Sequence, residues 1–163
     1  MDTQFHPFAE SHRTAVIDII NHYAIHSFAT FMENPIPYEG FNTLLDSAKT
    51  YPAFAVETAE RGIIGMGMLR QYMPWPTFSH TAEISYFLHP DACGQGIGSA
   101  LLEHLLTAAK EKGITNIVAK ISSENQASVR FHQRHNFTHC GTIQAACKKQ
   151  GRLLDIIWMQ RLL

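Results

Sequence analysis

The sequence predicts one α+β domain over residues 1–163, in which a sheet contains one strand-helix-strand crossover near the middle of the chain. Three observations lead to this class. The 163 residues are 45% hydrophobic and 17% charged, as in a typical globular domain. Apolar residues recur first at helical spacing, then at strand spacing, and then in alternating helical and strand segments. No internal repeat or low-complexity segment divides the chain.

Two helices are expected before the first main strands. Ser11 can cap the first helix, because apolar residues then recur at helical spacing, namely Val16, Ile19, Ile20 and Tyr23. Residues 34–37 (NPIP) must form a loop, since proline fixes φ and lacks the backbone donor. A short second helix is expected over residues 41–49.

The middle of the chain changes to strand periodicity. Residues 54–58 and 63–69 flank a turn at residues 60–62, which predicts a β-hairpin. Residues 81–88 predict a third strand, which ends at a histidine and a proline. The chain therefore runs through three strands before its next helix.

The second half alternates between helices and strands. Residues 96–112 predict an amphipathic helix, and Gly113 is a suitable left-handed stop. A strand (116–121), a helix (125–135) and two strands around residues 148–151 follow. The expected order is α-α-β-β-β-α-β-α-β-β, and one additional strand at the N-terminus is compatible with it.

Charge and composition exclude several classes of protein. A net charge of −1 and a pI of about 6.8 offer no basic surface for nucleic acid or an anionic membrane. No apolar run approaches the roughly 18 residues that cross a bilayer. The N-terminus (MDTQFH) lacks the pattern of a secretion signal, so a cytoplasmic protein is expected. Cys93, Cys140 and Cys147 lack C-x-x-C spacing, so neither a disulfide framework nor a cysteine zinc site is expected.

The most informative segment is a glycine-rich turn between the third strand and the amphipathic helix. Gly94, Gly96 and Gly98 alternate there, and glycine lets the backbone approach a ligand closely. Free N–H groups at a helix start favour an anion, most often phosphate, although a tight turn without a ligand is the alternative. Ser99 stands where a P-loop has lysine, and Ser99 and Leu101 stand where a dinucleotide motif would need glycine.

The block of residues 81–137 resembles the GNAT superfamily of acetyl-CoA-dependent N-acetyltransferases, whose signature [Q/R]-x-x-G-x-[G/A] opens a helix after a strand. Motifs at residues 80–155 resemble, more closely, the branch of this superfamily that acetylates phosphinothricin and methionine sulfoximine. The motifs that carry this likeness are HTAE at 80–83, HPD at 89–91, SENQAS at 123–128 and LLD at 153–155. One departure is Cys93, which replaces the Gln or Arg of the signature.

The resemblance implies a GNAT fold, in which a mixed, mostly antiparallel twisted sheet is flanked by helices. It also implies transfer of an acetyl group from acetyl-CoA to the primary amine of a small molecule, with an amino acid or analogue as a candidate. The amine would attack the thioester directly in a ternary complex, without a metal, and backbone N–H groups at the strand end would stabilise the oxyanion. A homodimer is expected by analogy. Contacts to coenzyme A are expected from Phe87, Leu88, Gly94, Gln95, Gly96, Ile97, Gly98, Ser99, Asn125 and Ser128.

Two residues are candidates for catalysis. Glu83 lies within an apolar strand, where it either serves as the base that deprotonates the amine or faces solvent; the resemblance favours the base. His132 takes the position at which much of the superfamily has a tyrosine that protonates the departing thiolate. It is expected either to donate a proton or orient the substrate, or to be an ordinary helix-surface residue. His135 and His139 do not complete a zinc site with it, since Asn136 ends the helix between them.

The acceptor pocket is expected to involve residues 28–38 and 72–80. Tyr72, Met73, Trp75 and Phe78 would line it, unless they cover the edge of the core. The branch holds acidic substrates with two arginines, and those positions are Met73 and Ser79 here. A bulkier or less acidic amine than phosphinothricin is therefore expected. The alternatives are another acceptor (a polyamine, an aminoglycoside or a protein N-terminus) and a non-catalytic sensor that binds coenzyme A.

Overall fold

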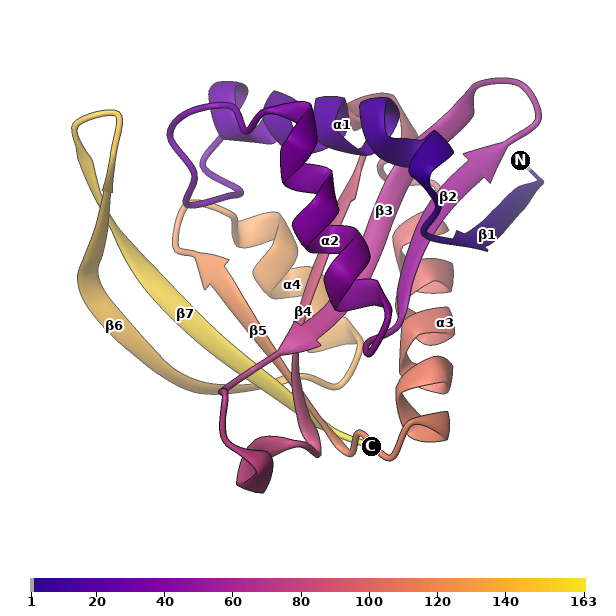
Figure 1. Cartoon of the computed structure of the whole chain (residues 1–163). Coiled ribbons are helices and arrows are strands. Elements are labelled where there is room, and N and C mark those ends of the chain that lie inside the picture. The colour runs from indigo at the N-terminus through magenta and orange to yellow at the C-terminus, as the bar shows by residue number, and fades with distance from the viewer. Residues whose placement is uncertain (1) are drawn as a thin grey trace.

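In the computed structural model, which describes residues 2–163, one seven-stranded sheet runs in the order β1-β2-β3-β4-β5-β7-β6 (Figure 1). The strands are β1 (Thr3–Pro7), β2 (Ala53–Thr58), β3 (Gly62–Gln71), β4 (Thr81–Leu88), β5 (Asn116–Ser122), β6 (Thr138–Lys149) and β7 (Arg152–Leu162). The helices are α1 (Arg13–His26), α2 (Phe41–Ala48), α3 (Ile97–Glu111) and α4 (Gln126–Arg134). The expected order is confirmed, and the additional N-terminal strand is β1, which pairs with β2.

The start of the first helix differs from the sequence-based expectation. Ser11 does not cap α1, because it lies inside a 3-10 turn (Glu10–His12) that precedes the helix. The residue at the cap position is His12, and it makes no side-chain capping bond. The arginine that follows instead ties this turn to the next segment, since Arg13 donates to the backbone carbonyl of Tyr38.

The helices cover both faces of the sheet. Met66 and Met68 of β3 pack with the apolar residues of α1 and α2 in one core cluster. Between them, Gly67 points to the other face, where a Cβ would come within 2.9 Å of side-chain carbons of Leu101 and Leu105 on α3. The glycine therefore lets α3 lie close against β3. The larger core cluster, which includes all the buried residues of α3, forms on this second face.

The sheet opens between β4 and β5. These parallel strands pair only from Thr81 to Glu83, opposite Asn116 to Val118. Each strand stays paired along its other edge, β4 with β3 and β5 with β7. The remaining halves of the two strands separate, as Figure 1 shows. The result is a wedge whose closed end lies at Glu83 and Val118, and whose β4 edge carries backbone groups without a neighbouring strand on that side.

The hairpin formed by β6 and β7 fastens the loop between α1 and α2. Lys149, which is fully buried, donates from Nζ to the carbonyl oxygens of Ser27 (2.7 Å) and Thr30 (2.9 Å). The next backbone N–H, that of Gln150, donates to Glu33. The far end of this hairpin thus fixes a loop more than a hundred residues earlier in the chain. None of the helices in the described part of the chain is long and apolar enough to cross a membrane.

Candidate active site

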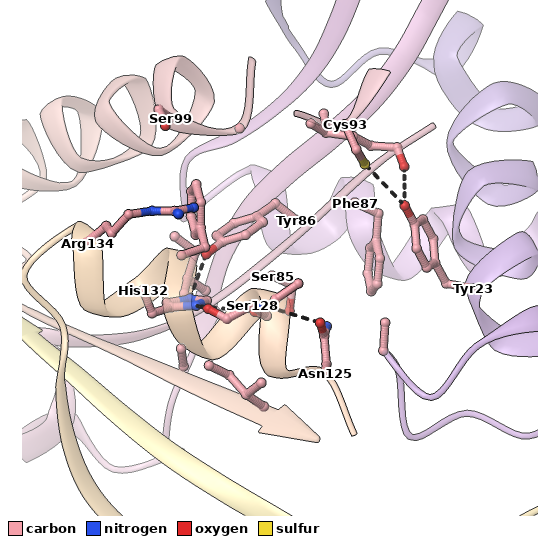
Figure 2. Close-up of a pocket in the computed structure, with 18 of the residues that line it drawn as sticks. Tyr23, Ser85, Tyr86, Phe87, Cys93, Ser99, Asn125, Ser128, His132 and Arg134 are labelled. Atoms are coloured by element: carbon pink, nitrogen blue, oxygen red, sulfur yellow. Dashed lines mark hydrogen bonds between the residues drawn. The ribbon is translucent and has the colours of Figure 1, made fainter. Parts of the chain in front are cut away.

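A cavity of about 700 Å³ occupies the wedge between β4 and β5. Its walls come from the separated halves of the two strands, the glycine-rich turn before α3, the length of α4 and the C-terminal half of α1. Figure 2 shows the polar side chains that surround it. Residues far apart in the sequence therefore meet where the sheet splits, at the N-terminal end of a long helix.

The glycine-rich turn forms one wall in the way the sequence predicts. Gly94 and Gly96 have φ values of 77° and 81°, in the left-handed region that glycine tolerates. Gly96 is the N-cap of α3, so the first N–H groups and the positive end of the helix dipole are directed to the cavity. Gly98 and Ser99 also line the cavity. The turn thus presents backbone N–H groups to the cavity, and at its three glycines no side chain stands between the backbone and the cavity.

Two of the expected contact residues turn their side chains elsewhere. Ile97 is 5% exposed and belongs to the core beneath α3. The side chain of Gln95 donates to the carbonyl oxygen of Asp91. Any contribution of these two residues to a bound anion is therefore limited to their backbone N–H groups.

Arg134 is a cavity residue that sequence reasoning missed. It lies at the end of α4, lines the cavity and extends into it, as Figure 2 shows. Its guanidinium brings a positively charged side chain to the cavity that Cys93, the residue at the signature position, also lines. In the sequence, the only indication of this residue is that an arginine stands near the end of the helix expected over residues 125–135.

Tyr23 of α1 closes the end of the cavity near the strand terminus. Its hydroxyl donates to the carbonyl oxygen of Leu88 at 2.6 Å. Leu88 is expected to contact coenzyme A, but its carbonyl is therefore already engaged within the protein. The Sγ atom of Cys93 lies 3.8 Å from the same hydroxyl oxygen. Burial, together with the neighbouring Cys93, raises the pKa of Tyr23, which keeps the hydroxyl protonated as a donor. Phe87 lies against the tyrosine ring, 5.4 Å between ring centres.

His132 is buried beside a second tyrosine. Its Nε2 lies 2.6 Å from the hydroxyl of Tyr86, and its Nδ1 lies 2.8 Å from the carbonyl oxygen of Ser128 (Figure 2). A carbonyl only accepts, so the geometry assigns the proton to Nδ1, and Nε2 accepts the hydrogen bond of Tyr86. Asn125, which also lines the cavity, caps α4 by accepting from the N–H of Ser128.

Burial changes the acid–base behaviour of this pair. It lowers the pKa of His132 from 6.5 to about 4, so the imidazole is neutral at pH 7 and not poised near neutrality as its ordinary pKa suggests. Burial also raises the pKa of Tyr86 well above its ordinary value. The alternative of a helix-surface histidine is wrong, because His132 is 3% exposed. No feature of the sequence indicates that Tyr86 contacts His132.

Glu83 lies at the closed end of the wedge but does not line the cavity. The residue is only 6% exposed, so the alternative in which it faces solvent is wrong. Its Oε1 accepts from Arg70 at 2.6 Å, and its Oε2 accepts from Lys120 at 2.9 Å. Both carboxylate oxygens are therefore engaged by cations in this structure.

The residues expected around the acceptor are divided. Tyr72 and Phe78 line a second cavity of about 640 Å³, together with Trp158 of β7. Met73 and Trp75 line neither cavity and are exposed. The structure thus supports an aromatic second cavity, but it brings only half of the expected set to it. Among residues 2–163, no group of three or more histidine, cysteine or acidic residues could hold a metal ion.

Comparisons with known proteins agree with this geometry. The chain is 30% identical to a phosphinothricin N-acetyltransferase of Streptomyces coelicolor, with 98% of this chain and 96% of the relative covered. It is also 30% identical to an L-methionine sulfoximine/L-methionine sulfone acetyltransferase of Salmonella typhimurium, over 90% and 86% of the two chains. The structure of yncA from Salmonella typhimurium with its cofactor acetyl-CoA superposes with a TM-score of 0.93 at 26% identity, over 100% and 95% of the chains.

The chain therefore shares its fold with this solved acetyltransferase over its whole length. The family model that matches, over residues 15–137, is described as the acetyltransferase (GNAT) family. That match covers both walls of the wedge and the helices that hold them. The chain belongs to the acetyltransferase (GNAT) family.

Proposed function

We propose that this protein is an N-acetyltransferase that uses acetyl-CoA to acetylate the primary amine of a small molecule, an amino acid or a close analogue. The observation that carries the proposal is the cavity in the split between β4 and β5, which begins at the glycine cradle before α3. The relatives named for phosphinothricin and for methionine sulfoximine support the acceptor class.

The residues present fit coenzyme A. Backbone N–H groups of the turn at residues 94–99 and the start of α3 suit a pyrophosphate, and Arg134 adds a cation. The open edge of β4 near Phe87 and Leu88 suits the amide groups of a pantetheine arm, through backbone groups other than the Leu88 carbonyl that Tyr23 occupies. Asn125 and Ser128 lie on the opposite wall. Acetyl-CoA supplies the acetyl group in an activated form, as a thioester.

The chain's own side chains would handle the protons. Glu83, at the closed end of the wedge, accepts the proton of the amine, directly or through a water molecule. His132 is neutral and has both ring nitrogens engaged, so it orients the hydroxyl of Tyr86, which lines the cavity, and does not itself donate a proton. Backbone N–H groups at the end of β4 stabilise the charge that develops on the acetyl oxygen.

The proposal is tested by release of free thiol from acetyl-CoA with a panel of amines that includes phosphinothricin and methionine sulfoximine. We expect turnover that depends on the amine, and a fall in kcat of at least tenfold in Glu83→Gln. Tight binding of acetyl-CoA without turnover of any amine would instead identify a non-catalytic sensor. Rapid turnover of phosphinothricin would show that arginines at positions 73 and 79 are dispensable.

We also propose that the chain acts as a single domain, as a cytoplasmic homodimer without nucleic-acid or membrane partners. Exposed free thiols at Cys93 and Cys140 suit a reducing compartment. The mostly exposed edge strand β6 offers a surface for a second copy. Light scattering on the purified protein decides the oligomeric state, and a monomeric mass at micromolar concentration would refute the dimer.

A further inference from the structure

Three charged side chains form a cluster on one face of the sheet, at the closed end of the wedge. Arg70 of β3 lies directly opposite Glu83 of β4, and Glu83 lies opposite Val118 of β5. Lys120 follows two residues after Val118, so it projects from the same face. The cluster therefore comes from three neighbouring strands whose backbones are held by the sheet.

The charges in this cluster do not balance. Glu83 carries one negative charge and is paired with both Arg70 and Lys120. No other acidic side chain among residues 2–163 forms an ion pair with either cation. One positive charge is therefore uncompensated, beside a carboxylate whose side chain is only 8% exposed. A second anion would complete the cluster, and it would be least screened where water is scarce.

The cations can still be reached by a ligand. The side chain of Lys120 is 32% exposed and that of Arg70 is 47% exposed, unlike the carboxylate between them. Lys120 lines the first cavity, in which acetyl-CoA is proposed to bind. Its Nζ also lies 5.7 Å from the ring centre of Trp158, which lines the second cavity. Lys120 thus stands at the boundary between the two cavities.

The second cavity suits an apolar group. Tyr72 lies against both Phe78 and Trp158, with ring centres 5.9 Å and 6.2 Å apart, and all three rings line the cavity. The other polar lining residues of this cavity are uncharged hydroxyl and amide groups and His80. A ligand that spans the boundary would place an anionic group on the cluster and an apolar side chain against these rings.

We propose that Arg70 and Lys120 bind the carboxylate of the acceptor, an amino acid with an apolar or aromatic side chain that occupies the second cavity. The inference rests on the proposed acetyltransferase function. The acceptor carboxylate competes with Glu83 for its two cations, so binding of the substrate leaves an oxygen of Glu83 free to accept the proton of the amine. The base is thereby released only when a carboxylate-bearing acceptor is in place. The two cations on β3 and β5 take the part that Met73 and Ser79 cannot.

The test compares acids with their amides. Thiol release from acetyl-CoA is measured with L-phenylalanine, L-leucine and L-methionine and with the primary amide of each. The wild-type protein should give a kcat/KM at least tenfold higher for an acid than for its amide. Lys120→Met and Arg70→Met should each raise KM for the acid about tenfold. In each variant the loss of kcat/KM for the amide should be about fivefold smaller than the loss for the acid, because the amide has no carboxylate for these cations to bind.

Two controls make the test specific. Lys110→Met removes an exposed lysine of α3 and should leave both substrates unchanged. Thermal melting of each variant checks that the fold survives.

Equal rates for acid and amide in the wild type, or equal losses for both in Lys120→Met, would overturn the subsite while the acetyltransferase function stands. Absence of thiol release with every acceptor, phosphinothricin included, would instead overturn the function itself and the subsite with it. Turnover of phosphinothricin with none of the apolar amino acids would overturn the assignment of the second cavity.

Discussion

The buried imidazole of His132 should make the stability of the protein depend on pH. Burial lowers its pKa to about 4 in the folded protein, whereas the ordinary value of 6.5 applies to the unfolded chain. Between these values the unfolded chain binds a proton that the folded protein does not. The contribution of His132 to stability is therefore fully present above pH 6.5 and is lost as the pH falls towards 4.

The size of this effect follows from the shift. The pKa of His132 differs by about 2.5 between the unfolded and the folded chain. Because a difference of one in pKa corresponds to about 1.36 kcal/mol, the free energy of unfolding changes by roughly 3 kcal/mol over the whole pH range. At pH 4.5 the two protonation equilibria give a loss of about 2–3 kcal/mol relative to pH 7.5. This is a large share of the stability of a typical domain, which is about 5–15 kcal/mol.

The assay is urea unfolding of the wild type and of His132→Gln at pH 7.5 and pH 4.5. Carboxylates also titrate in this range, but they do so in both proteins, so the difference between the two isolates His132. We expect the wild type to lose about 2–3 kcal/mol more than the variant on acidification, whatever the absolute stability of the variant. Parallel losses in the two proteins would refute the reasoning, because His132 would then titrate alike in the folded and unfolded chains.

Two further predictions concern the walls of the site. Lys149→Met leaves two loop carbonyls without their donor, so it should cost about 3 kcal/mol by urea unfolding. Because Ala29 of this loop lines the first cavity, the variant should also raise KM for acetyl-CoA more than KM for the amine, whereas Lys148→Met, at the exposed neighbour, should do neither. Equal effects of these two variants would show that the hydrogen bonds of Lys149 to the loop carbonyls do not hold the loop in place. Gly96→Ala and Gly113→Ala each force a side chain onto a residue with φ above 70°, so both should lose about 1–2 kcal/mol, but calorimetry should show weaker acetyl-CoA binding only for Gly96→Ala.

The elements and the glycine turn could be predicted from the sequence because their signals are local. Hydrophobic spacing identified the strands and helices, and the alternate glycines marked the cradle before α3. The start of α1 was missed, since Ser11 is an acceptable cap in sequence but lies within a 3-10 turn in the structure. Local signals therefore served well until a tertiary contact, such as that of Arg13 with the Tyr38 carbonyl, competed with them.

The chemistry of the site depends on contacts that no local signal reports. Tyr86 and His132 lie 46 residues apart and meet only because α4 packs on the open half of β4. The pairing of Arg70 and Lys120 with Glu83 follows from the register of three strands. Burial also changes the protonation of a site residue in a way that its residue type does not indicate. It makes His132 neutral, which the ordinary pKa of histidine does not suggest.

The central claim is that an amine receives the acetyl group directly within the split between β4 and β5. The most direct measurement is a single-turnover reaction of the protein with acetyl-CoA and an amino acid that it acetylates, followed by mass spectrometry of the products and of the intact chain. We expect one N-acetylated amine for each free thiol released, with the protein unmodified at every time point. An acetyl group carried by the chain itself during turnover, on Cys93 for example, would contradict the direct transfer, as would thiol release without an acetylated amine.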